Sequence, residues 1–186
     1  MKAPECTNSP GGRLFVAANI HGSTACWRKF VNSADFYDAD VLILGGDTTG
    51  KAIFPIVDEG DRYTYTRQGD EHEITDEEEL DDLLGSLENT GYYPYVMDRD
   101  EYERLQHADD ADERQNEIFI SEMKSRIEQW IEFGEERLDD TPVYASPGND
   151  DPFEIDGVWE SSDLVRLVEG EVVEIGNSGI FRPEML

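Results

Sequence analysis

Two short apolar runs near the start of the chain enclose a segment of helical periodicity. Leu14–Ala18 and Val41–Leu44 are continuous apolar runs, typical of strands that are buried on both faces. Ser23, a residue suited to cap a helix, precedes apolar side chains at helical spacing. These side chains are Cys26, Trp27, Phe30, Val31 and Ala34. The pattern predicts strand, helix and strand, the opening unit of an α/β fold.

The pattern changes between about residue 52 and residue 110, and we interpret this segment as an inserted α+β cap subdomain. Ile53–Val57 and Arg62–Thr66 predict a hairpin, and Tyr92–Met97 predicts a further strand. Thr75 opens a capping-box pattern, T-x-x-E, ahead of leucines at helical spacing. We expect this subdomain to lie over the functional face of the main domain.

Helical and strand patterns return after the insertion. Residues 112–138 predict a long helix with one apolar stripe, which we interpret as core packing. Val143–Ala145 predicts a third buried strand, Pro152–Ser161 a helix, and Glu171–Ile175 a last strand. We therefore expect one α/β domain over residues 13–186, after a flexible leader over residues 1–12.

Acidic residues outnumber basic residues by 44 to 15 in this chain of 186, which gives a formal net charge of −29. The excess is spread along the whole chain, which indicates a halophilic protein from a cytoplasm of molar salt, where screening removes self-repulsion. An ordinary acidic protein is the alternative. The sequence contains no cluster of basic residues, so we do not expect a groove that binds nucleic acid. We expect no membrane partner and a cytoplasmic location, because no signal peptide precedes the first strand and no apolar run is long enough to span a membrane.

Polar side chains follow each of the three predicted strands of the main domain. Asn19 and His21 follow the first strand, Asp47 the second, and Asn149 and Asp150 the third. Ligands of α/β proteins bind at such strand ends. Imidazole, carboxylate and amide donors suit first-row divalent ions such as Mn, Fe, Co, Ni or Zn. One such residue alone is usually a cap or a loop residue, so the prediction depends on all three segments together.

The three segments, in this order, resemble the first three motifs of the calcineurin-like metallophosphoesterases. Those motifs are Asp-x-His, Gly-Asp and Gly-Asn-His-Asp, and the segments here are Asn19–His21, Gly46–Asp47 and Gly148–Asp151. The whole chain is similar to the N-terminal portion of an archaeal-type enzyme of this family. The resemblance implies a sheet-and-helix sandwich, of which this chain supplies the first half, and a two-metal site that hydrolyses phosphate esters.

The same resemblance implies a role for each residue, and it also reveals departures. His21 would bind the first metal, Asp47 would bridge both metals, and Asn149 would bind the second. Asn19 stands where the family has an aspartate, and Asp150 stands where it has the general-acid histidine. We expect Asn19 to weaken metal binding, because it removes a negative charge from beside the ion, whereas Asp150 remains the candidate catalytic group.

Histidines that complete the family's site have no counterpart in this sequence. No histidine follows Asp151, and we interpret His72 and His107 as solvated surface residues. Two hypotheses therefore stay open. The chain is a metal-dependent phosphoesterase, or it is a non-catalytic, truncated or partner-dependent relative. The second hypothesis predicts self-association or a protein partner, because one sheet of the sandwich would leave apolar surface uncovered.

A third class of protein is suggested by the segment Gly45–Lys51, which fits the phosphate-binding pattern G-x-x-x-x-G-K. The following residue is Ala52, where a magnesium-binding Ser or Thr is required, and Pro55 lies in an extended pattern where a helix should begin. We therefore do not favour an NTPase.

Overall fold

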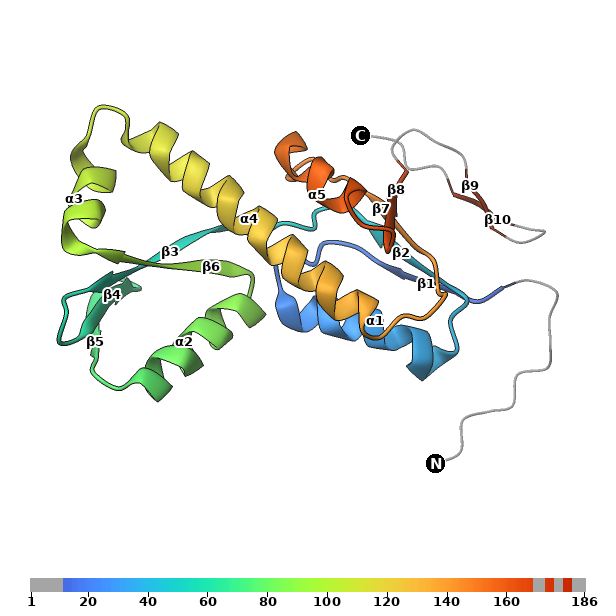
Figure 1. Cartoon of the computed structure of the whole chain (residues 1–186), viewed down its shortest axis with the longest axis horizontal. Helices are drawn as coiled ribbons and strands as arrows, with labels where there is room; N and C mark the ends of the chain where they lie inside the picture. Colours follow the sequence, from blue (N-terminus) through green and yellow to red (C-terminus); the bar gives the residue numbers. More distant parts are fainter. Residues whose placement is uncertain (1–11, 169–172, 176–178, 182–186) are drawn as a thin grey trace.

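Two four-stranded β-sheets, with one long helix running between them, form most of the mixed α/β fold (Figure 1), and β9 and β10 form a separate antiparallel pair. The computed structural model describes residues 12–168, 173–175 and 179–181. The predicted leader, except Gly12, and the first two residues of the predicted strand Glu171–Ile175 lie outside the described residues. The elements are β1 (Leu14–Ala17), α1 (Thr24–Tyr37), β2 (Val41–Gly45), β3 (Ala52–Asp58), β4 (Tyr63–Arg67), β5 (Asp70–Ile74), α2 (Glu77–Asn89), β6 (Tyr92–Asp98), α3 (Arg99–His107), α4 (Ala111–Glu135), β7 (Val143–Ser146), a 3-10 turn η1 (Phe153–Ile155), α5 (Asp156–Glu160), β8 (Val165–Leu167), β9 (Val173–Ile175) and β10 (Gly179–Phe181).

The first sheet has the strand order β1-β2-β7-β8, and all its strands are parallel. The predicted strand–helix–strand unit is confirmed as β1, α1 and β2. Ser23 caps α1, as predicted, because its side chain accepts a hydrogen bond from the Cys26 N–H. Parallel strands place the segments that follow β1, β2 and β7 at one edge of the sheet. Sequence patterns did not predict β8, which is three residues long.

Helices α1, α4 and α5 pack on one face of the first sheet around a group of tryptophans. The rings of Trp27 and Trp130 stack with centroids 5.2 Å apart, and the Trp27 Nε1 donates to the Trp130 carbonyl oxygen at 2.8 Å. The predicted apolar stripe of α4 is confirmed as core packing, since Met123, Ile127, Trp130 and Ile131 are buried. Burying each of these side chains stabilises the fold by roughly 1.5–3 kcal/mol.

The face of the first sheet that lies opposite to these helices is exposed to solvent only in part. Val41 and Ile43 of β2 are buried on it, whereas Leu14 and Val16 of the edge strand β1 are 45% and 58% exposed. Apolar side chains alternate along β1, with Phe15 and Ala17 packed against the helices. Among the described strands, the uncovered apolar surface of this sheet is therefore concentrated at β1.

The second sheet has the strand order β5-β4-β3-β6 and a small core of its own. The predicted hairpin is confirmed as β3 and β4, and the further strand as β6. Helix α2 packs on one face of this sheet, and α3 contacts β3 and β6. The predicted cap Thr75 is one residue early, because the Asp76 carboxylate accepts from the Glu78 and Glu79 N–H groups. Sequence patterns missed β5 and α3, whose sequences are mostly polar.

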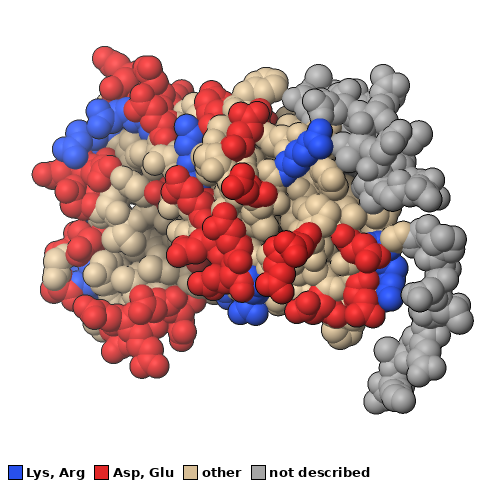
Figure 2. Space-filling model, turned by 45° about the vertical axis from the view of Figure 1, so that its right-hand side comes forward, with Lys and Arg blue, Asp and Glu red and all other residues tan. Residues whose placement is uncertain are grey.

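Helix α4 connects the two halves of the molecule. Its first part contacts α3 and β6, and its later part packs on α1 and α5 (Figure 1). Acidic side chains dominate the face of the molecule in Figure 2, and basic side chains are few and scattered there. Within the described part of the chain, no helix combines the length and the apolar character needed to span a membrane.

Candidate functional site at the strand ends

The segments that follow β1 and β2 are hydrogen-bonded to one another through their backbones. The Asn19 N–H donates to the Gly46 carbonyl oxygen at 3.0 Å, and the His21 N–H donates to the Asp47 carbonyl oxygen at 3.0 Å. A third bond joins the Gly22 N–H to the Thr48 carbonyl oxygen at 2.8 Å. The structure therefore brings the first two predicted motifs together, side by side.

The segment after β7 joins the same edge through a close contact between Gly148 and Asp47. A Cβ atom at Gly148 would overlap the backbone nitrogen and the carboxylate of Asp47. The Asp150 N–H donates to the Asp47 Oδ1 at 3.3 Å. Glycine is required at position 148 because the two backbones approach more closely than any side chain permits. Asp47 is thus in contact with the third motif as well as the first.

Three of the predicted ligands have left-handed backbone conformations. Asn19, His21 and Asp47 have φ angles of 56°, 45° and 49°. Among the described residues only two other non-glycine residues share this conformation, Asp38 at the end of α1 and Gln68 in the β4–β5 turn. Such a conformation costs about 1–3 kcal/mol and occurs often in functional sites. Three strained residues at one strand-end edge mark it as the candidate site.

Asp151 holds the second and third motifs together, a role that sequence reasoning did not assign to it. Its carboxylate accepts from the N–H groups of Thr48, Thr49 and Gly148 at 2.8–3.1 Å, and from the Thr49 Oγ1 at 2.8 Å. The only sequence signal for this role is the place of Asp151 at the end of the third motif. These bonds also argue against the phosphate-loop alternative. In a phosphate-binding loop the N–H groups of Gly45–Lys51 would bind phosphate, but here two of them, those of Thr48 and Thr49, bind Asp151. In addition, strand β3 follows the segment where a helix is required.

The side chains of the site differ in exposure. His21 and Asp47 are half-buried, whereas Asn19, Asn149 and Asp150 are exposed. The Asn149 Nδ2 donates to the Asp150 Oδ1 at 2.8 Å. An amide that donates through its nitrogen presents its oxygen on the opposite side, which suits a metal ligand.

The donor chemistry fits a cation that is held weakly. No group of three His, Cys, Asp or Glu side chains that could hold a metal ion occurs in the part of the chain that the structure describes. A divalent ion here would depend on the carboxylate of Asp47 and the imidazole of His21, together with the amide oxygens of Asn19 and Asn149. Only one of these four donors carries a full charge, so electrostatic attraction for the ion is limited.

Arg126 of α4 and Tyr93 of β6 support the segments that follow β1 and β2. The Arg126 guanidinium is buried, donates to the Gly22 carbonyl oxygen at 3.0 Å and to the Tyr92 carbonyl oxygen at 3.3 Å, and lies 4.8 Å from the Tyr93 ring centroid. The Tyr93 hydroxyl accepts from the Gly50 N–H at 3.0 Å, and burial raises the pKa of this hydroxyl. These contacts connect the segments after β1 and β2 to β6 and α4.

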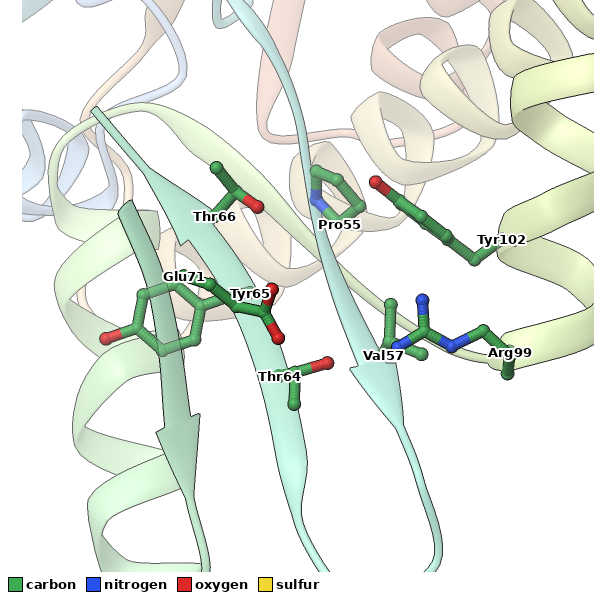
Figure 3. A pocket seen from close by; sticks show the side chains of 8 residues that line it. All are labelled: Pro55, Val57, Thr64, Tyr65, Thr66, Glu71, Arg99 and Tyr102. Carbon is green, nitrogen blue, oxygen red and sulfur yellow. The ribbon is translucent and has the colours of Figure 1, made fainter. Parts of the chain in front are cut away.

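A hollow of about 110 Å³ lies on the second sheet, and its side chains come from β3, β4, β5 and α3 (Figure 3). Arg99 lines it, and the guanidinium of Arg99 pairs with Glu59, which lowers the pKa of that carboxyl. None of the predicted ligands lines this hollow. His72 and His107 are exposed on β5 and α3, in agreement with their interpretation as solvated residues.

Comparison of the chain with protein-family models, with curated proteins and with solved structures found no match. The class of protein therefore has to be inferred from the strand-end site itself.

Proposed function

We propose that the strand-end edge of the first sheet is a metallophosphoesterase-type site that binds a divalent cation and phosphate esters. One observation carries the proposal. Asn19, His21 and Asp47, which the motif resemblance assigns to metal binding, all have strained left-handed backbones at adjacent strand ends. Strain of this kind persists only where the surrounding structure enforces it.

Each residue has a chemical role in this proposal. Asp47 and His21 would hold the cation, with Asn19 and Asn149 as neutral oxygen donors. When bound, the cation neutralises phosphoryl oxygens and supplies hydroxide at neutral pH. Asp150, whose N–H donates to Asp47, is the candidate acid–base group for the leaving oxygen. Asp151 keeps the third motif in register with the second through its four donor groups.

A second candidate function is a non-catalytic or partner-dependent relative of these enzymes. The neutral side chain of Asn19 favours it, because Asn19 stands where the family has an aspartate and leaves Asp47 as the one charged member of the four-residue donor set. Such a protein would bind a cation or a phosphate ester without turning it over, or would need donors from another chain.

Hydrolysis of p-nitrophenyl phosphate and bis-(p-nitrophenyl) phosphate, with manganese in molar KCl, tests the proposal together with calorimetric titration of manganese. We expect Asp47→Ala to weaken manganese binding by about 10- to 100-fold, because it removes the one carboxylate of the donor set. Asp139→Ala, at an exposed loop position, is the matched control and should change nothing.

The two readouts separate the two candidate functions. Manganese-dependent turnover that Asp47→Ala abolishes supports the enzyme. Manganese binding that depends on Asp47, without turnover of either ester, supports the non-catalytic relative, and Asn19→Asp should then strengthen binding. If manganese binds equally to the wild type and to Asp47→Ala, or binds to neither, the cation site is not at this edge.

A further inference from the structure

An aromatic surface at the outer side of α1 is unlike the rest of this acidic molecule. Two of the seven large apolar side chains that are exposed in the described part of the chain, Phe36 and Tyr37, are neighbours at the end of α1. Phe36 is the most exposed of the seven, at 78%, and Tyr37 beside it is 53% exposed. An apolar group of this kind on a soluble surface marks an interaction site.

These aromatic residues line a shallow hollow of about 600 Å³, which we call the α1 hollow. Phe15, Phe36 and Tyr37 form its apolar part, and Lys29, Asn32 and Asp35 are among its polar lining residues. The rings of Phe15 and Tyr37 stack with centroids 5.4 Å apart, so these two side chains pack against each other. A hollow of this size accepts an aromatic side chain.

The charge around the α1 hollow is nearly balanced, in contrast to the whole chain. Residues 6–34 contain no Asp or Glu, although the chain has 44 acidic residues in 186. On a surface rich in carboxylates, contact between two copies of the chain brings like charges together. At the α1 hollow the exposed charges include Lys29 and Asp35, one of each sign. Repulsion between two copies of this chain that meet at this surface is therefore expected to be weak.

The spacing of the lining residues makes the surface self-complementary. Lys29 and Asp35 are three residues before and three residues after Asn32 on the same helix. With a rise of about 1.5 Å per residue, each lies roughly 4.5 Å along the axis from Asn32. Two antiparallel α1 helices that cross at Asn32 place Lys29 of each copy opposite Asp35 of the other. This is the arrangement that a two-fold axis requires.

We propose that the α1 hollow is the interface of a homodimer, in which two α1 helices pack antiparallel across a two-fold axis near Asn32. Phe36 of each copy enters the α1 hollow of the other, and Lys29 pairs with Asp35 across the axis. The proposal concerns assembly and is independent of the cation site.

Sedimentation equilibrium in molar KCl, over a wide range of protein concentration, tests the dimer. We expect a mass of twice 21.1 kDa at high concentration. Phe36→Ser should raise the dissociation constant about tenfold or more, because it removes the central aromatic contact. Phe153→Ser is the matched control, since Phe153 is 74% exposed on another part of the surface, and it should leave the dimer intact. Circular dichroism checks that both variants are folded.

A charge exchange tests the antiparallel register. Lys29→Asp and Asp35→Lys should each weaken the dimer, and the double variant should restore it, because the pair is re-formed with its signs reversed. A mass of 21.1 kDa at every concentration overturns the proposal. A dimer that Phe36→Ser leaves unchanged overturns it as well, and so does a double variant that is no stronger than either single variant.

Discussion

Asp47 is the residue at which the three strand-end segments meet. Its carbonyl oxygen accepts from His21, its Oδ1 accepts from the Asp150 N–H, and Gly148 lies directly against its backbone. A left-handed residue in such surroundings has little room to adjust, because each neighbouring segment is bonded to it. The site therefore depends on small residues around Asp47 as much as on the ligands themselves.

Gly148→Ala tests this close approach. The added methyl group would overlap the Asp47 backbone, so we expect the free energy of unfolding to fall by about 1–3 kcal/mol. Urea unfolding in molar KCl measures the change. Gly157→Ala in α5 is the control, because a Cβ there meets nothing within 4 Å, and helix propensity predicts a gain of up to about 1 kcal/mol. Equal effects of the two variants would mean that position 148 tolerates a side chain.

At the scale of elements, α4 links the two sheets through Arg126. This residue is 4% exposed, and its guanidinium bonds carbonyl oxygens from two different parts of the chain, Gly22 beside β1 and Tyr92 in β6. A buried guanidinium is stable only when its donors are satisfied. Here the satisfied donors hold the segment after β1 against the second sheet.

Arg126→Met should reduce the free energy of unfolding by about 2–3 kcal/mol, because methionine fills the space but removes the hydrogen bonds to these carbonyl oxygens and the ion pair with Glu88. Arg114→Met, on the same helix, removes only an exposed ion pair with Asp110 and should change stability by less than about 1 kcal/mol. Urea unfolding of both variants provides the comparison. If Arg126→Met loses no more than Arg114→Met, the link between the sheets does not depend on the guanidinium.

The whole molecule carries a charge of −29, and the ion pairs among the described residues lie mostly at exposed positions. Exposed pairs contribute little to stability. Repulsion among carboxylates is therefore opposed mainly by salt, whose screening length falls from about 10 Å at 0.1 M to about 3 Å at 1 M. We infer that a fold with so few basic residues is fully stable only at high ionic strength.

Transfer from molar KCl to 0.1 M KCl should lower the thermal midpoint. A loss of about 3 kcal/mol corresponds to roughly 6–12 °C for a chain of this length. Scanning calorimetry measures the shift, and sucrose at matched osmolality is the control, because it is excluded from protein surfaces without screening charge. A midpoint that sucrose restores in full, or that does not depend on salt, would contradict the interpretation.

Periodicity in the sequence determined most of the elements. Apolar runs identified β1, β2 and β7, and helical spacing identified α1 and α4, because these elements bury one face or both. The same rule missed β5 and α3, since β5 buries only Ile74 and α3 only Leu105, so neither has an apolar pattern to read. The motif order alone also selected Asn19, His21, Asp47 and Asn149 as candidate ligands.

Tertiary structure decided the contacts among these residues. The left-handed conformations at Asn19, His21 and Asp47 occur where the strand-end segments meet. The hydrogen bonds of Asp151 and Arg126 join residues that are as much as 104 positions apart in the sequence. No local pattern encodes such contacts, because they arise only when parallel strands bring distant loops to one edge. Local periodicity determined which segments are buried, whereas the packing of whole elements decided which polar groups meet, since burial is a property of one segment and a site is a property of several.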